Sequence, residues 1–124
     1  MSRRAPEPSE RGMVTAETAV VLPLIAAFAL ALIWMVLTVI VQVQLVDASR
    51  DAARSLARGD DEQTAVAHAR QTAPRGASIA VTTVNDSVTV TVEHEAKAPR
   101  WLLVPLPSVH LESHATVARE SDPE

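Results

Sequence analysis

The chemically active groups near the start of the chain are few, and Glu17 is the most unusual of them. It follows a polar segment that ends in Gly12, and it stands at the head of a run, 18–46, without any charged side chain. An unpaired charge at the edge of a hydrocarbon layer costs a few kcal/mol, so a carboxylate there needs a partner or the headgroup region. The residues leave two readings open: a solvated acid stabilised by the helix dipole, or an acid that pairs with an amine.

A second candidate group lies near the end of the chain, where His110 and His114 flank Glu112. At alternate positions of a strand these side chains share one face, and imidazole and carboxylate groups are zinc ligands. Alternate residues on an exposed strand face are more often simply solvated, so we expect no metal there. A membrane-anchored metal-dependent enzyme using this face is the weakest of the alternatives.

The remaining sequence offers little else for catalysis. It contains no cysteine, and therefore no thiolate zinc site and no cysteine nucleophile. It also lacks a glycine-rich phosphate loop, a metallopeptidase helix and a nucleophile elbow. We therefore predict that the protein is not an enzyme and that it takes no cofactor.

The element that must position Glu17 is the apolar run 18–46. About 20 apolar residues cross a bilayer core of about 30 Å, and this run is longer. A chain of 124 residues is too short to bury so long an apolar helix on all sides. Pro23 removes one backbone donor and should loosen the first turns. The run therefore predicts a single membrane-spanning helix.

Beyond Val46 the sequence favours more helix, because alanine, arginine and leucine dominate it. Gly59 is a good helix stop. We therefore expect one helix from near Met13 to near Arg58, apolar in its first half and amphipathic in its second. The second half carries a basic ridge, which we interpret as a solvated face: Arg50, Arg54 and Arg58.

The segment after Gly59 predicts a small α+β domain. Asp60 or Asp61 caps a short helix over 62–73, which Pro74 closes. Two alternating β-branched runs, 77–84 and 87–94, flank an Asn-Asp turn and favour a hairpin. A third strand follows over 109–120. The predicted fold class is thus α+β, with a long N-terminal helix, a short helix and an antiparallel sheet of about three strands.

Two features of this domain bear on its packing and contacts. Aromatic residues are nearly absent, so its core must consist of small aliphatic side chains. The segment 98–108 contains three prolines and is expected to form a loop with an apolar tip made of Trp101, Leu102, Leu103, Val104 and Leu106. Such a tip either fills a small core or marks a contact site.

The stretch RGMVTAETAVVLPLIAAF resembles the processing region of type IV prepilins, and among these the TadE-like minor pilins or pseudopilins of tight-adherence (Flp-type) pilus systems. A short polar leader ends in Gly12, the mature chain would begin at Met13, and Glu17 would be its fifth residue. The stretches QVQLVDASRDAARSLARGD and APRGASIAV resemble actinobacterial members of that family. Met13 stands where classical type IV pilins more usually have phenylalanine, which leaves N-methylation open.

The resemblance implies that a prepilin peptidase cuts after Gly12 on the cytoplasmic side, so that the apolar helix stays with the mature protein. It also implies that the carboxylate of Glu17 pairs with the N-terminal amine of a neighbouring subunit and fixes the register of assembly. The implied organisation is a leader (1–12), the transmembrane and amphipathic helix (13–58), a small extracytoplasmic domain (59–119) and a polar tail (120–124).

The implied partners are the prepilin peptidase, other pilin or pseudopilin subunits, the pilus assembly platform and the membrane. The implied location is the cell membrane, single-pass with a cytoplasmic N-terminus, and in some states a pilus. Arginines flank the apolar run on both sides in near-equal number, so charge alone does not decide the orientation. The net charge of −4 argues against nucleic acid. The alternative is an unprocessed single-pass protein whose extracytoplasmic domain scaffolds a secretion or surface complex.

Overall fold

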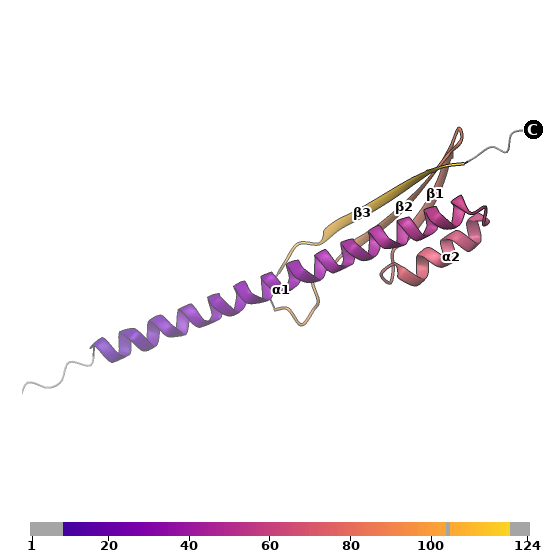
Figure 1. The fold of residues 1–124 in the computed structure, drawn as a ribbon. Helices are drawn as coiled ribbons and strands as arrows, with labels where there is room; N and C mark the ends of the chain where they lie inside the picture. The colour runs from indigo at the N-terminus through magenta and orange to yellow at the C-terminus, as the bar shows by residue number, and fades with distance from the viewer. Residues whose placement is uncertain (1–8, 104, 120–124) are drawn as a thin grey trace, which may run out of the picture.

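One helix, α1 (Ser9–Ala57), extends far beyond the rest of the molecule, as Figure 1 shows. A short helix, α2 (Glu62–Thr72), and a sheet of β1 (Ser78–Val84), β2 (Ser87–Ala96) and β3 (Val109–Ala118) lie beside the C-terminal half of α1. This arrangement confirms the predicted α+β fold class.

The computed structural model describes residues 9–103 and 105–119. The predicted polar tail, 120–124, and residues 1–8 of the predicted leader lie outside the described residues. All five helices and strands fall within the described ranges.

α1 begins at Ser9, four residues before the predicted start at Met13. The added turn places Glu10 where a carboxylate is favourable beside the N-terminal end of the helix dipole. A glycine inside a helix costs only about 1 kcal/mol relative to alanine, so Gly12 does not stop the helix from starting earlier. The helix also continues through Pro23.

The C-terminal end of α1 is set by Gly59, which has a φ of 89°. The N–H of Gly59 donates to the Leu56 carbonyl at 3.0 Å, and the N–H of Asp60 donates to the Ser55 carbonyl at 3.2 Å. This pair of bonds is the Schellman motif, in which a left-handed residue, usually glycine, lets the last carbonyls find donors. The predicted stop at Gly59 is thus confirmed.

α2 starts as its sequence predicts. Asp61 is the N-cap, and its carboxylate accepts hydrogen bonds from the backbone N–H of Thr64 at 3.3 Å and from the Thr64 hydroxyl at 2.6 Å. These bonds satisfy a donor that the first turn of a helix otherwise leaves free. Ala73 forms the C-cap, directly before Pro74.

The three strands form one antiparallel sheet in the order β1-β2-β3. The β1–β2 hairpin turns at Asn85, whose φ of 53° lies in the left-handed region that asparagine tolerates. Val84 pairs with Ser87 across this turn, and Val92 pairs with Ser113 across β2 and β3. The predicted hairpin and third strand are therefore confirmed.

The core lies between the sheet, α2 and the C-terminal half of α1. Its side chains are small and aliphatic, as the composition predicts: Leu45, Ala48, Ala52, Ala65, Ala69, Ala77, Val90 and Val92. Alanines let the two helices approach each other closely, and alternate valines of β2 supply the bulk from the sheet. The second half of α1 is thus part of the folded core.

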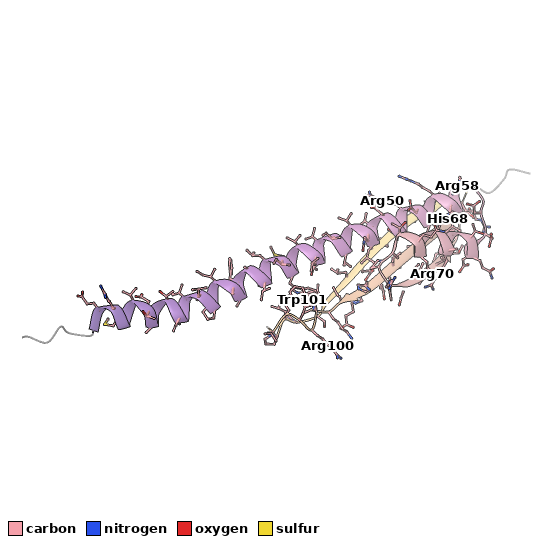
Figure 2. The ribbon with its side chains drawn as sticks, turned by 90° about the horizontal axis from the view of Figure 1, so that it is seen from below. Arg50, Arg58, His68, Arg70, Arg100 and Trp101 are labelled. Carbon is pink, nitrogen blue, oxygen red and sulfur yellow. The ribbon has the colours of Figure 1, made fainter. Side chains whose placement is uncertain are left out.

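The basic ridge of α1 lies on the opposite side from this core. Arg50, Arg54 and Arg58 are all exposed, and Figure 2 shows Arg50 and Arg58 pointing away from the sheet. Arg58 forms an ion pair with Asp60 at 3.3 Å. The interpretation of the ridge as a solvated helix face is confirmed.

Candidate processing and assembly site

The three predicted site residues lie together in the first turns of α1. Gly12, Met13 and Glu17 are all helical and all exposed. Met13 and Glu17 are four positions apart, so both face the same side of the helix. A new amine on Met13 would therefore lie on the side of α1 that carries the Glu17 carboxylate.

Gly12 stands apart from the other glycines. Gly59 and Gly76 have φ values of 89° and 82°, where a side chain is strained, so the backbone explains both. Gly12 has a helical backbone, and a Cβ added to it would meet no atom within 4 Å. Neither backbone conformation nor packing therefore accounts for a glycine at position 12, although glycine weakens a helix.

Glu17 has no hydrogen-bond or ion-pair partner among residues 9–103 and 105–119. The neighbouring hydroxyls are satisfied within the helix: Thr15 donates to the Arg11 carbonyl at 2.9 Å, and Thr18 donates to the Val14 carbonyl at 2.8 Å. Glu17 is thus a carboxylate whose partner, in an apolar setting, must come from outside the described chain.

The helix surface that follows Glu17 is apolar and bare. No residue in the most apolar stretch of α1 is buried, and this stretch is long enough to cross a membrane. The exposed side chains are large and aliphatic or aromatic: Val20, Leu22, Leu24, Ile25, Phe28, Ile33, Met35, Val36, Val39 and Ile40. So much apolar surface needs lipid or other helices around it.

Cleavage after Gly12 would change the electrostatics of Glu17. The first four N–H groups of a helix lack partners and carry the positive end of the helix dipole. In the present chain these groups belong to the turn that begins at Ser9. With Met13 as the first residue, the free N–H groups and the new amine would all lie within about one turn of Glu17.

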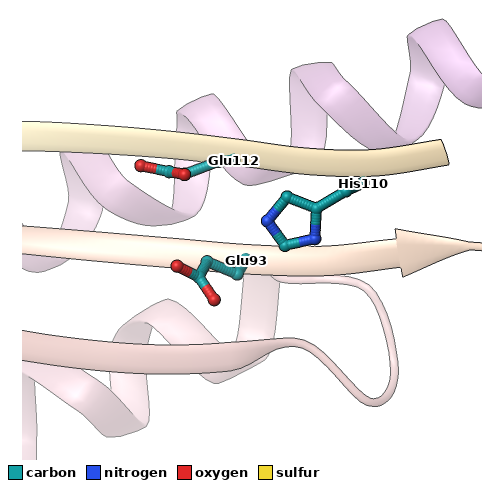
Figure 3. Close-up of side chains that lie close together, drawn as sticks. All are labelled: Glu93, His110 and Glu112. Carbon is teal, nitrogen blue, oxygen red and sulfur yellow. The ribbon is translucent and has the colours of Figure 1, made fainter.

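The group of possible metal ligands on β3 differs from the expected set of His110, Glu112 and His114. Glu93, His110 and Glu112 have ligand atoms within 4.8 Å of one another, whereas His114 is outside this group. Glu93 enters because it pairs with Glu112 across β2 and β3. Figure 3 shows the three side chains together on one face of the sheet, with α1 behind it.

This group has the donor types of a divalent-metal site. Histidines that bind zinc are usually oriented by a hydrogen bond from the second ring nitrogen. In the described part of the chain, the His110 ring donates no such bond, and neither glutamate carboxylate accepts a hydrogen bond. Sequence reasoning missed Glu93 because only the register between β2 and β3 brings it to Glu112. The group is weaker as a site than the start of α1.

Comparison with known proteins points to the same segment. Residues 12–54 match the family model described as TadE-like protein. The match begins at Gly12 and covers most of α1, but not α2 or the sheet. No curated protein and no solved structure matches the chain.

Proposed function

We propose that this chain, which is TadE-like over residues 12–54, is a minor pilin or pseudopilin of a tight-adherence pilus or a related assembly system. It is a structural protein that a prepilin peptidase processes after Gly12. It acts by packing its long helix against other subunits. The family match supports a pilus-associated, membrane-anchored protein, and the residues at the start of α1 support the finer role.

The observation that carries this proposal is the unexplained glycine. Gly12 sits in open space with a helical backbone, so folding gains nothing from it. A peptidase that needs a small residue before the cut would account for it. The family match begins at the same residue.

Glu17 supplies the second support. Its carboxylate heads a long apolar surface and has no partner in the described chain. In the proposed assembly it forms an ion pair with the α-amine of Met13 of a neighbouring subunit. The two opposite charges then leave water together, which costs less than burying either one alone. The pairing would set the axial register between neighbouring helices.

The bare half of α1 supplies the third support. Before assembly its apolar side chains would lie in lipid, with the N-terminus cytoplasmic and the sheet outside the membrane. On assembly the same side chains would pack against the helices of other subunits. The direct partners in this proposal are the peptidase, other pilin or pseudopilin subunits and the assembly platform.

Glu17→Ala in the native host tests the assembly role. We expect the variant to enter the membrane and lose its leader as the wild type does, and to be missing from sheared pili or from the purified platform. Glu10→Ala is the matched control, since the leader that contains it is removed. Normal incorporation of Glu17→Ala would contradict the proposed pairing.

A second candidate function is an unprocessed single-pass protein that scaffolds a surface complex. The observation in its favour is that α1 runs from Ser9 through Gly12 and Met13 without a break, so the bond to be cut is helical. The end turns of helices open at little cost, so this helical start does not prevent cleavage. If the protein is an unprocessed scaffold, Glu17→Ala should assemble into its complex as the wild type does.

A further inference from the structure

The described residues of the loop between β2 and β3, 97–103 and 105–108, include two large and exposed apolar side chains. Trp101 is 62% exposed and Leu103 is 93% exposed, whereas Leu102 between them is only 5% exposed. The N–H of Leu102 donates to the Pro99 carbonyl at 3.0 Å and closes a turn. Leu102 therefore fixes the loop to the molecule, while its two neighbours project outward and do not fill the core.

Two contacts fix the position of this loop along α1. Gln42 Nε2 donates to the Glu112 carbonyl oxygen at 3.2 Å, and the hydroxyls of Ser49 and Ser113 are 3.1 Å apart. β3 therefore runs in the same direction as α1. The start of β3 lies four residues before Ser113, about 14 Å closer to the N-terminal end of α1.

That distance corresponds to about nine helical residues at a rise of about 1.5 Å each. β3 thus begins beside about residue 40 of α1, and the loop lies at or before that level. Figures 1 and 2 both show the loop at this end of the sheet, toward the free half of α1, and Figure 2 places Trp101 and Arg100 there.

If the lipid core begins where the apolar run begins, its other edge falls at the same level. A hydrocarbon core takes about 20 helical residues, so a core that begins at Thr18 ends near Leu37. Trp34 lies close to that boundary. Tryptophan is enriched at membrane–water interfaces, because its ring is apolar and its N–H is polar. Both tryptophans of the chain, Trp34 and Trp101, are therefore at one interface.

We propose that Trp101 and Leu103 insert into the interfacial region of the lipid leaflet from which the second half of α1 emerges. This inference rests on the proposed membrane-spanning state of α1. Three prolines stiffen the loop, so little conformational freedom is lost on insertion. Arg100, exposed beside Trp101, faces the phosphate headgroups.

The loop is thus a second attachment that holds the sheet close to the membrane. A subunit that leaves the bilayer for a filament has to withdraw these two side chains as well as the first half of α1. The loop therefore raises the barrier for extracting the subunit from the membrane. It also fixes the orientation of the sheet relative to the membrane before assembly.

Depth-resolved fluorescence of the full chain in phosphatidylcholine vesicles tests this. Trp34→Phe leaves Trp101 as the single tryptophan. We expect lipids brominated near the headgroup end of the acyl chain to quench it more than lipids brominated near the bilayer centre. We also expect its acrylamide quenching constant to be at least about threefold below that of a water-exposed control.

The matched control is Val84→Trp in a chain with both natural tryptophans replaced by phenylalanine. Val84 is 60% exposed, close to the value for Trp101, but it lies at the hairpin end of the sheet, away from the loop. This reporter should be quenched by acrylamide and not by brominated lipid.

Three results would overturn the proposal. In the first, Trp101 is quenched by acrylamide and not by brominated lipid, as the Val84→Trp reporter is. Trp34, studied alone in the Trp101→Phe variant, is quenched by brominated lipid. α1 would then span the membrane while the loop stays in water. The second is Trp101 shielded from acrylamide without lipid quenching, which indicates a second copy over the loop. The third is an absence of quenching of Trp34 by brominated lipid. This result would contradict a membrane-spanning α1, and with it the proposed function.

Discussion

The two halves of α1 differ in what surrounds them, although both belong to one uninterrupted helix. In the first half the large side chains are exposed: Leu24, for example, is 68% exposed and lies outside the core cluster. In the second half Leu45 is fully buried, and small residues such as Ala48 and Ala52 meet α2 and the sheet. The first half is thus built for partners outside the chain and the second for partners within it.

The difference shows that apolar character alone does not make a core. Bulky side chains in the first half suit lipid or neighbouring helices, which adapt to them. Alanines in the second half suit a fixed backbone distance to α2. Substitutions of the same type should therefore lower the stability of the fold in the second half and leave it unchanged in the first, and this gives direct tests of the comparison.

The largest contrast is expected for leucine. Leu45→Ala leaves a cavity in the core and should lower the free energy of unfolding of the α+β part by about 2–5 kcal/mol. Leu24 is exposed and lies outside the core, so Leu24→Ala should leave this free energy unchanged. Denaturant titration of the full chain in detergent, followed by circular dichroism, measures both. Equal losses for the two variants would contradict the division.

The reverse substitution sharpens the comparison. Ala52→Leu forces extra volume between α1, α2 and the sheet and should cost about 1–3 kcal/mol. Ala29→Leu adds the same atoms to an exposed position of the first half and should leave domain stability as it was. Thermal unfolding of the two variants side by side separates these outcomes, and a stable Ala52→Leu would show that the core is loosely packed.

The glycines at the two ends of α1 give a smaller contrast. Gly59→Ala places a Cβ at a φ of 89° and should cost roughly 1–2 kcal/mol. Gly12→Ala fits the helix without a clash and should stabilise the first turns by up to about 1 kcal/mol. Hydrogen exchange at the two ends of α1 reads out both effects. Loosening of the first turns by Gly12→Ala would show a folding role for this glycine.

The smallest effect concerns pH at the end of the packed half. A 2.6 Å hydrogen bond from the Ser55 hydroxyl, and secondarily the charge of Arg58, hold the pKa of Asp60 below its ordinary 3.8. Because this pKa is lower in the folded chain, the stabilisation is present above pH of about 3.8 and is lost as the pH falls through the folded value. Asp60→Asn should flatten the acid limb of a stability–pH curve. An unchanged limb would contradict this assignment.

Much of the fold could be predicted from local chemistry. A cap at Asp60 or Asp61, a stop at Gly59 and an Asn-Asp turn at Asn85 were each predicted from a few residues; the structure has all three, with Asp61 as the cap. The alternating run that predicted the second strand is also local, and in β2 its valines, Val88, Val90 and Val92, are the buried ones.

Other features depend on contacts that no local pattern contains. Glu93 reaches Glu112 only through the register between β2 and β3, so the sequence suggested His114 in its place. The start of α1 at Ser9 was missed because a polar, glycine-containing turn still supports a helix. The roles of Gly12, Met13 and Glu17 remain predictions, since they concern partners outside the chain.

The most direct test of the account is the intact mass and N-terminal sequence of the protein isolated from its own membranes. We predict a chain that starts at Met13, with or without a methyl group on its amine. We also predict that Gly12→Val accumulates at full length, while Gly59→Ala, which disturbs only the fold, is cut normally. A native protein that keeps residues 1–12 in cells with an active prepilin peptidase would contradict this account.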